Sequence, residues 1–573
     1  MGKFLLGLIT GVLLVFLTIV LLFFAALRFR ERPPEMAANS VLVLRLSGDI
    51  PERSAVQIPF LSEGPSLTVA NVWMTLRKAA ADSNIRAIVL EPDGLSAGWG
   101  KLEELRSDVE QFRKSGKPVY AFLRTPTARE YYVATAADRI YLGPADQMYL
   151  KGLRAEVMYL KKTLDKVGVT VDVEHAGKYK DFGDTFTRSD MSPETREVIT
   201  SVVDDLYGNL VARIAAARKM TPAHVGELID AGLFIAPEVQ KAGLVDELRF
   251  EDQVWGELNS RLQVKDVKKV RAETYLRVPP ESVGLQGKSR VALVIGEGDI
   301  VQGSPDNAAE DEGGLTAAGF NRLLREVGND SSIRGVIVRI DSPGGEVTAS
   351  DDIWREMNLL SKKKPMVISM SDLAASGGYY MAMTGDPIVA YPGTETGSIG
   401  VVFGKPNLHG LYDKIGITKD FVQRGKYAGI DSDYNSLTLE ERAKLRTGID
   451  ASYQDFVTKV ANARHRPFNE IEPVAQGRVW LGSQAKSRGL VDELGGLDTA
   501  IDLVKKKANI PAGERVTVIT YPPPRSLLEL LTRRTSQDDM LDVQLRRVFG
   551  GMPYRAWMKG GLLRLMPYWI AVR

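Results

Sequence analysis

Ser376 stands at a glycine-rich junction between two runs of different character. Gly377 and Gly378 follow the serine. Residues 365–370 before it are short, apolar and β-leaning, and residues 379–383 after it read as helix. A serine on such a tight turn can project its hydroxyl while the following amides point toward a developing oxyanion. The same small residues suit a close helix–sheet crossing, so this motif alone leaves a nucleophile and a packing motif about equally open.

A second glycine turn follows the strand-like run before this one. Residues 335–340 are apolar, and Asp341-Ser-Pro-Gly-Gly345 comes directly after them. Glycines in a turn permit positive φ and leave backbone N–H groups uncovered by side chains. Two such turns after successive strands could bracket one carbonyl oxygen. Asp341 and Asp372, the acidic neighbours of the turns, are expected to cap or hold them rather than to transfer protons.

Composition limits the bases that are available to a serine nucleophile. The chain of 573 residues contains no cysteine, which excludes disulfides, thiolate metal sites and a cysteine nucleophile. Its four histidines form no metal-like pair and supply a serine–histidine triad poorly, so we expect no metal and no cofactor. A net charge of +2 gives no argument for nucleic-acid binding. A nucleophilic serine here would need another base.

An internal repeat predicts two copies of one α/β domain in tandem, at about residues 41–255 and 290–506. Matching segments lie 248 residues apart over most of each copy and 246 residues apart near its end: 84–90 and 332–338, 165–170 and 413–418, 243–248 and 489–494. Each copy alternates strand-like runs with amphipathic segments such as residues 101–114 and 350–361. This alternation predicts βαβ crossovers and a parallel sheet.

The two copies differ where chemistry would occur. Ala128 in the first copy stands at the position of Ser376. Conversely, Gly177-Lys-Tyr-Lys180 in the first copy corresponds to Gly425-Lys-Tyr-Ala428 in the second. Lys180 and Ser376 are each present once, which suggests one composite site with the nucleophile from the second copy and the base from the first. Lysine can accept a hydroxyl proton if burial among apolar groups lowers its pKa toward neutrality.

Two nearby side chains compete with Lys180 for the role of base. Lys178 has a counterpart, Lys426, in the copy that carries the serine, and a lysine kept in both copies fits a structural role better. His175 corresponds to Gln423, and no carboxylate stands at a recognisable spacing to orient it. We therefore interpret His175 as a surface or supporting residue.

These motifs together resemble the signal peptide peptidase A family, membrane-bound Ser/Lys peptidases within the wider Clp protease and crotonase fold group. The segments that carry the resemblance are Ser342-Pro-Gly-Gly345, Ala375-Ser-Gly-Gly-Tyr-Tyr380, Thr396-Gly-Ser-Ile-Gly-Val401, Tyr179-Lys180 and Met191-Ser-Pro193. The resemblance implies an α/β fold of tandem duplicated Clp/crotonase-like domains. It also implies that Ser376 is the nucleophile and Lys180 the general base.

The resemblance further implies which groups surround the reacting atoms. The oxyanion donors would be the backbone N–H groups of Gly345 and Gly377, with Gly344 as an alternative. Ser398 is expected near the site, where its hydroxyl could hydrogen-bond the lysine amine. A plain strand-to-loop turn at Ser398 is an equal alternative.

The N-terminal region predicts a membrane anchor within residues 1–32. Residues 4–27 carry no charge and would give roughly 36 Å of helix against a hydrocarbon core of about 30 Å. An uncleaved anchor is favoured over a signal peptide because the run is too long and lacks a clear small-x-small site. Counting flanking positive charges would leave the body in the cytoplasm. The resemblance implies instead an inner-membrane protein with a periplasmic body, and we adopt that expectation.

Two further segments lie outside the repeats. Residues 256–289 are predicted as a linker and residues 507–573 as a C-terminal extension. Residues 552–573 mix aromatic, apolar and basic side chains, as an interfacial membrane helix does. Docking on a neighbouring subunit is the competing interpretation.

The sequence predicts a membrane-anchored serine endopeptidase that cuts hydrophobic peptides through an acyl-enzyme. The resemblance adds cleaved signal peptides as substrates and a homo-oligomer, a tetramer, as the assembly. A crotonase-like acyl-CoA enzyme and a non-catalytic membrane scaffold are the alternatives. The first would need neither a covalent serine nor an anchor, and the second would tolerate loss of the nucleophile.

Overall fold

The structure is a computed structural model, and parts of the chain lie outside it. The described parts are residues 33–54, 67–303, 315–523, 562–566 and 571–572, with scattered residues among the first eighteen. Most of the expected membrane span, residues 4–27, and most of the expected interfacial segment, residues 552–573, lie outside the described residues. Within the described part of the chain, no helix is both long enough and apolar enough to cross a membrane.

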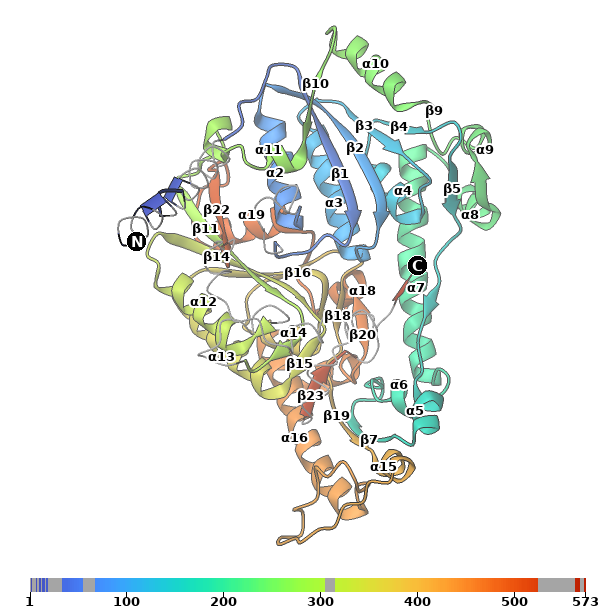
Figure 1. Cartoon of the computed structure of the whole chain (residues 1–573), viewed down its shortest axis with the longest axis vertical. Helices are drawn as coiled ribbons and strands as arrows, with labels where there is room; N and C mark the ends of the chain where they lie inside the picture. The colour runs from blue at the N-terminus through green and yellow to red at the C-terminus, as the bar shows by residue number, and fades with distance from the viewer. Residues whose placement is uncertain are drawn as a thin grey trace.

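The first repeat folds around a parallel sheet in the strand order β10-β1-β2-β3-β4-β9 (Figure 1). Its strands are β1 (Ser40–Gly48), β2 (Ile85–Leu95), β3 (Val119–Leu123), β4 (Arg139–Leu142), β9 (Glu247–Leu248) and β10 (Lys268–Arg271). Its principal helices are α2 (Val69–Ala81), α3 (Trp99–Arg113), α4 (Ala128–Ala134), α7 (Pro193–Arg218) and α10 (Glu251–Leu262). The central strands β2, β3 and β4 are largely buried, as parallel strands with helical crossovers require, whereas the edge strand β10 is mostly exposed.

The second repeat builds the same kind of sheet in the order β20-β18-β16-β14-β11-β22, with β17 beside β16 and β21 beside β17. Its strands are β11 (Ser289–Glu297), β14 (Ile333–Ser342), β16 (Met366–Ala375), β17 (Ile388–Ala390), β18 (Glu395–Gly397), β20 (Val479–Leu481), β21 (Glu493–Leu494) and β22 (Val516–Tyr521). Its helices include α12 (Ala317–Asn329), α13 (Val347–Lys363), α14 (Gly377–Met381), α16 (Leu439–Ala463), α18 (Gly482–Ser487) and α19 (Leu497–Lys507). The predicted α/β class is confirmed.

A third sheet contains strands from both repeats, in the order β13-β12-β15-β23-β19-β7. Its strands are β7 (Thr170–Ala176), β12 (Ile300–Val301), β13 (Leu315–Thr316), β15 (Gly344–Glu346), β19 (Val401–Asn407) and β23 (Leu562–Leu565). Strand β7 of the first repeat pairs antiparallel with β19 of the second along its whole length. In Figure 1 the first repeat reaches down past the second through α7, and β7 lies beside β19 near the lower end.

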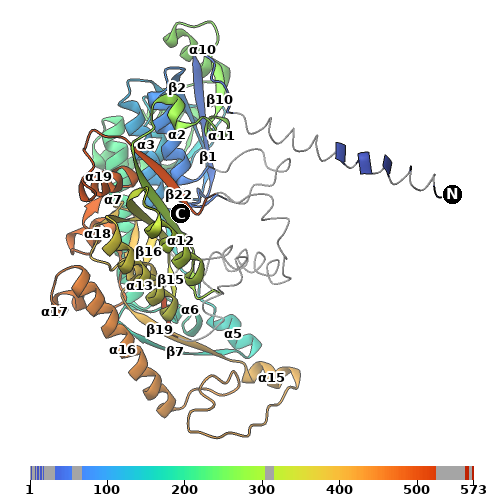
Figure 2. The same cartoon turned by 90° about the vertical axis from the view of Figure 1, so that its left-hand side faces the viewer.

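The remaining short elements connect these sheets. They are β5 (Gln147–Leu150), β6 (Ala155–Glu156), α5 (Lys161–Val167), α6 (Asp184–Thr187), α8 (Pro222–Ala231), β8 (Gly232–Ile235), α9 (Ala236–Lys241), α11 (Ala272–Tyr275), η1 (Pro280–Val283), α15 (His409–Ile415), α17 (Phe468–Ile471), η3 (Glu472–Val474) and β24 (Ala571–Val572). Figure 2 shows α16 running along the side of the molecule toward the end that carries α15.

The two repeats share an apolar core as well as a sheet. Helix α2 of the first repeat packs Ala70 and Trp73 on strands of the second sheet, next to Leu497 and Val504 of α19. Trp73 also donates a hydrogen bond from Nε1 to Asp498 Oδ1 at 2.6 Å. Burial of this apolar surface holds the repeats in one arrangement.

Two segments outside the expected repeats take part in the sheets and cores. Within residues 256–289, expected as a linker, β10 extends the first sheet beside β1 and α11 packs into the first core. Likewise β22 adds to the second sheet beside β11, beyond the expected end at residue 506. Each repeat thus ends with an edge strand. The sequence does not predict these strands, because a short edge strand forms through backbone pairing and need not show an apolar pattern.

The C-terminal extension also differs from the expectation of a membrane-surface helix. Residues 562–565 form β23, which pairs antiparallel with β15 on one side and with β19 on the other. Leu563, Arg564 and Leu565 are buried there. Two strands with unpaired edges supply backbone partners that outweigh the amphipathic character of the segment.

We expect residues 272–283 to behave as core. Tyr275 is fully buried, its hydroxyl donates to Asp82 Oδ2 at 3.0 Å, and Lys78 Nζ donates to carbonyl oxygens of residues 275, 276 and 278. Tyr275→Ala should lower the free energy of unfolding by about 3–5 kcal/mol. Tyr275→Phe should lower it by about 1 kcal/mol, through loss of the hydrogen bond alone.

Urea denaturation followed by tryptophan fluorescence measures both values. Lys265→Ala, on the exposed loop before β10, serves as the control and should stay within about 0.5 kcal/mol of the wild type. Equal stability of Tyr275→Ala and the wild type would show that this segment is a linker after all.

Candidate active site

Ser376 occupies a strained turn between β16 and α14. The strand ends at Ala375, the helix begins at Gly377, and Ser376 between them has φ 53° and ψ −111°. Few residues other than glycine adopt such angles, and strain of this kind persists only where the surroundings enforce it. The backbone N–H of Ser376 donates to the Gly397 carbonyl at 2.8 Å, which fixes the turn against β18.

The two glycines after Ser376 allow the helix to begin against neighbouring backbone. A Cβ on Gly377 would lie 2.6 Å from Ser350 Oγ, and one on Gly378 would lie 2.7 Å from the Ser342 carbonyl oxygen. A side chain at either position would displace Ser350 or the backbone at Ser342. The sequence requirement at both positions is therefore steric.

The second turn lies directly against the first. Gly344 has φ 101°, and a Cβ there would lie 2.6 Å from the Gly377 nitrogen. A Cβ on Gly377 would in turn lie 3.1 Å from the Gly345 nitrogen. The amides of both turns thus lie close together beside Ser376. The Gly377 amide also belongs to the first turn of α14, where helix N–H groups have no intrahelical partner.

Lys180 reaches Ser376 from the first repeat of the same chain. Strand β7 ends at Ala176, opposite Val401 of β19, and a turn at Gly177 then brings the lysine inward. Lys180 Nζ lies 2.7 Å from Ser376 Oγ, within hydrogen-bond distance. It donates to Ser398 Oγ at 2.8 Å and to the Ser398 carbonyl oxygen at 2.9 Å. The three predicted side chains meet within one protomer.

Two glycines that the sequence reasoning did not single out shape the channel for the lysine stem. A Cβ on Gly477 would lie 2.6 Å from Lys180 Cβ, and one on Gly400 would lie 3.0 Å from Lys180 Cδ. Gly400 is part of the glycine-rich segment after Thr396, so a signal for it was present. Gly477 is far from the other motifs in sequence, and its role follows only from the fold.

Burial controls the charge of the lysine. Lys180 is fully buried, and the loss of hydration lowers its pKa well below the ordinary value of 10.5. The carboxylate of Asp181 opposes the shift, and the guanidinium of Arg564 adds to it. A lysine in this setting can be a neutral amine, which is the form that accepts a proton.

The Met191-Ser-Pro193 segment supports the lysine indirectly. Ser192 caps helix α7 by accepting from the Thr195 N–H at 3.0 Å, and Pro193 is the first helical residue. The Thr195 hydroxyl then donates to the carboxylate of Asp181. Burial raises the pKa of Asp181 to about 6. The helix start thereby holds an acidic group next to the base.

Arg564 of β23 is a site neighbour that the sequence reasoning missed. Its guanidinium lies 3.5 Å from the Tyr380 ring centroid and donates to the Val347 carbonyl at 3.2 Å. Tyr380 belongs to α14, directly after the Ser376 turn. The mixture of basic and aromatic residues near the C-terminus suits a membrane contact, and it gives no sign that Arg564 lies beside Tyr380.

The competing residues lie elsewhere. The Lys178 side chain is 56% exposed and lies 3.9 Å from Glu194. His175 Nδ1 is 3.1 Å from the Gly177 carbonyl oxygen. Asp341 accepts from the Leu373 N–H, and Asp372 accepts from N–H groups at the start of α3, so both carboxylates hold backbone in place. Among the described residues, no group of three or more histidines and acids is placed to hold a metal.

Comparisons with known proteins agree with a duplicated peptidase. The family model described as peptidase family S49 matches residues 111–265 and 358–511. Serine protease SPPA, chloroplastic, of Arabidopsis thaliana is 36% identical over 506 residues, covering 86% of this chain and 72% of that protein. Protease 4 of Salmonella typhi is 32% identical over 496 residues, covering 82% of this chain and 78% of that protein.

The match with a solved structure of a ClpP1 mutant from Listeria monocytogenes covers 36% of this chain and 94% of the ClpP1 chain, at 18% sequence identity. Its TM-score of 0.23 is too low to carry an argument. The duplication is confirmed by the two family matches. The assignment to the Clp and crotonase fold group stays a prediction.

The depressed lysine pKa has a consequence for stability. Between the folded pKa of Lys180 and its ordinary value of 10.5, the unfolded chain binds a proton that the folded chain does not. The buried lysine therefore costs stability in this window, and the cost shrinks as the pH rises toward 10.5. Lys180→Met should be more stable than the wild type near pH 7, by roughly 0.5–2 kcal/mol.

Urea midpoints measured across the pH range check this, and the gap between the two proteins should close with rising pH. Lys178→Met removes an exposed lysine two residues away and should show no such pH-dependent gap. A Lys180→Met variant that is less stable than wild type at every pH would contradict a neutral buried amine.

Proposed function

The chain belongs to peptidase family S49, and from this membership and the site geometry we propose a serine endopeptidase with Ser376 as nucleophile and Lys180 as general base. The observation that carries the proposal is the 2.7 Å hydrogen bond between Lys180 Nζ and Ser376 Oγ, with the amine fully buried. An alkyl hydroxyl needs a positioned base, and the buried amine meets that need.

The proposed reaction proceeds by acyl transfer. The neutral Lys180 amine takes the Ser376 proton while Oγ attacks the carbonyl carbon of the scissile bond. The backbone N–H groups of Gly345 and Gly377, or of Gly344, donate to the oxyanion that develops. The Lys180 ammonium then protonates the leaving amine, and an acyl-enzyme remains. Lys180 next deprotonates a water that attacks the ester, and the proton returns to Ser376.

Ser398 orients the base in this scheme. Its hydroxyl and carbonyl oxygens accept hydrogen bonds from Nζ, which leaves the remaining position of the amine directed at Ser376. Ser398 has φ 50°, so its carbonyl is held in place by a constrained turn. This geometry favours proton transfer between the lysine and the serine over other partners.

We place the substrates and the location as part of the same proposal. Hydrophobic peptides, in particular cleaved signal peptides, are the substrate class that the family resemblance implies. The uncharged run at residues 4–27 would anchor the chain in the inner membrane with a periplasmic body, as part of a homo-oligomer, a tetramer by that resemblance. A non-catalytic scaffold has no use for a fully buried lysine, which lowers stability.

A fluorophosphonate probe tests the proposal on the full chain in detergent. Mass spectrometry should find the probe on Ser376, and Ser376→Ala should lose both labelling and peptide hydrolysis. Lys180→Met should label at least about 100-fold more slowly, because the proton acceptor is gone. Lys178→Met, the matched control, should label within about twofold of the wild-type rate.

The result that contradicts the proposal is equally specific. A Ser376→Ala protein that still hydrolyses peptides would assign the chemistry to another group. Full-rate labelling of Lys180→Met would remove the lysine from the mechanism while leaving the serine in it.

A further inference from the structure

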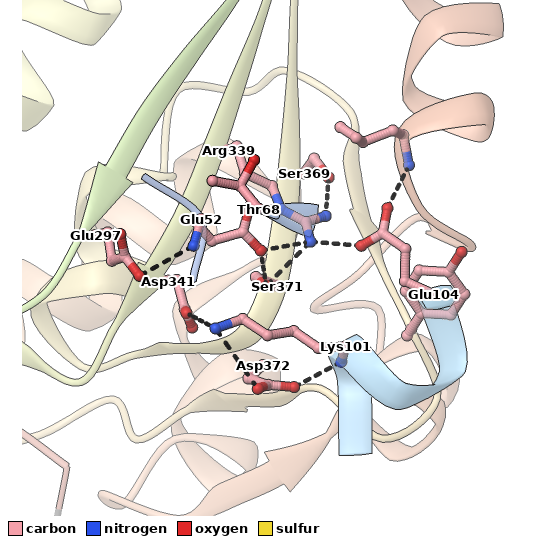
Figure 3. Close-up of polar contacts among 12 residues, drawn as sticks. Glu52, Thr68, Lys101, Glu104, Glu297, Arg339, Asp341, Ser369, Ser371 and Asp372 are labelled. Atoms are coloured by element: carbon pink, nitrogen blue, oxygen red, sulfur yellow. Dashed lines mark hydrogen bonds and ion pairs between the residues drawn. The ribbon is translucent and has the colours of Figure 1, made fainter. Parts of the chain in front are cut away.

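A buried cluster of charged side chains lies behind the two glycine turns, and the proposed reaction uses none of it. Figure 3 shows the cluster, which joins β14 and β16 of the second repeat to the first repeat. Glu52, Lys101, Glu104, Arg339 and Ser371 are almost fully buried in it, and the side chains of Asp341 and Asp372 are 12% and 18% exposed. Charges in such a setting cost stability unless each is paired. The pairing within the cluster therefore indicates what it holds.

Lys101, on α3 of the first repeat, is the cation of this cluster that pairs with Asp341 and Asp372. Its Nζ lies 2.8 Å from Asp341 Oδ2 and 3.9 Å from Asp372 Oδ2. Burial alone would lower the pKa of Lys101, but the carboxylates of Asp341 and Asp372 raise it well above 10.5. Unlike Lys180, this buried lysine is an ammonium ion with a fixed ionic partner.

The ionic partner completes a break in the sheet. Strands β14 and β16 pair regularly up to Ile340 and Met370, and the register then shifts, so that Ser342 pairs with Ala374. At the shift, Asp341 Oδ1 accepts the Leu373 N–H at 3.1 Å, a bond that the regular ladder does not supply there. Irregularities of this kind bend a strand and redirect the residues that follow.

This irregularity directly precedes both turns. Asp341 stands two residues before Pro343 of the glycine turn, and Leu373 stands three residues before Ser376. The hydrogen bond between Asp341 and Leu373 therefore links the turn at Pro343–Gly345 to the turn at Ser376. A rotation of the Asp341 carboxylate would break this bond and leave the two turns free to move relative to each other.

Asp372 ties the first repeat to the same place. Its carboxylate accepts the Gly98 N–H at 2.8 Å and the Lys101 N–H at 2.6 Å. Gly98 precedes α3 and has no side chain with which to cap it, so the second repeat supplies the cap. A Cβ on Gly98 would lie 2.5 Å from Asp372 Cγ, which explains the glycine.

The arrangement occurs once, although the fold is duplicated. At the repeat shift of 248 residues, Ala349 stands at the position of Lys101 and Arg124 at that of Asp372. Asp93 stands at the position of Asp341, but it has neither a lysine at the position of Lys101 nor an acid at that of Asp372, so the equivalent positions cannot form the same ionic pairing.

We propose that Lys101 is a positioning residue: from the first repeat, it holds the Asp341 carboxylate on the Leu373 N–H and thereby sets Ser376 against the glycine turn. The inference rests on the proposed function. It gives the first repeat a second contribution to the site, separate from the base Lys180.

The test compares three variants of the full chain in detergent. Lys101→Met leaves Asp341 without its ionic partner, and kcat and the rate of fluorophosphonate labelling of Ser376 should fall on the order of 100-fold with KM little changed. Lys101→Met with Asp341→Asn should recover most of the rate, because an asparagine oxygen can still accept the Leu373 N–H without a buried charge. Lys101→Met with Asp341→Leu is also uncharged but has no acceptor, and it should stay slow.

Arg77→Met is the control for contacts between the repeats. Arg77 forms an ion pair with Asp498 across the same boundary, away from the strand irregularity. The Arg77→Met variant should have a lower free energy of unfolding but a labelling rate within about twofold of the wild type. Circular dichroism confirms that each variant is folded before its rate is measured.

Two outcomes would overturn the inference. Equal rates for the two double variants, one with Asp341→Asn and the other with Asp341→Leu, would show that the Leu373 bond does not matter. A folded Lys101→Met protein that labels at the wild-type rate would reduce the cluster to a stabilising contact. Failure of the proposed function is distinguishable, since the wild-type chain itself would then not label at Ser376.

Discussion

The hydrogen bond between the Lys180 amine and the Ser376 hydroxyl is the interaction on which the rest of the structure depends. Neither group functions alone: the hydroxyl is a weak nucleophile, and the lysine is a useful base only where burial keeps it neutral. The bond crosses from one repeat to the other. Everything that fixes the repeats relative to each other therefore also fixes the distance over which the proposed proton transfer occurs.

Three kinds of contact hold that distance. Strand β7 pairs with β19 and delivers Lys180, the apolar face of α2 packs on the second sheet, and the charged cluster around Lys101 joins the two repeats behind the turns. Backbone pairing sets the register, apolar burial supplies most of the free energy, and the ionic contacts restrict orientation. The two halves of the duplicated fold thus have different proposed roles. The second repeat presents the strained Ser376, and the first supplies the Lys180 amine and the positioning residue Lys101.

Much of the site could be predicted from the sequence because it is written in local patterns. The glycines beside Ser376 are needed where backbone meets backbone, and the internal repeat isolated Lys180 by comparison with Ala428. What could not be predicted depends on partners distant in sequence. Three strands, β10, β22 and β23, pair with strand edges that are otherwise unpaired. Pairing of this kind uses backbone groups, so the sequence shows no side-chain pattern that would predict it. The pairing of Lys101 with Asp341 joins residues 240 apart, and a single charged residue gives no indication of its partner.

The account's central claim is that each chain builds its own site from both repeats. Co-expression of Ser376→Ala and Lys180→Met chains with different affinity tags, followed by sequential purification, selects assemblies that contain both if the proposed homo-oligomer forms. Fluorophosphonate labelling of those mixed assemblies tests the claim most directly. We predict labelling no faster than that of Lys180→Met alone, because no chain carries both groups. Recovery of a substantial fraction of the wild-type labelling rate would show that the amine reaches a neighbour's serine, and would contradict the account.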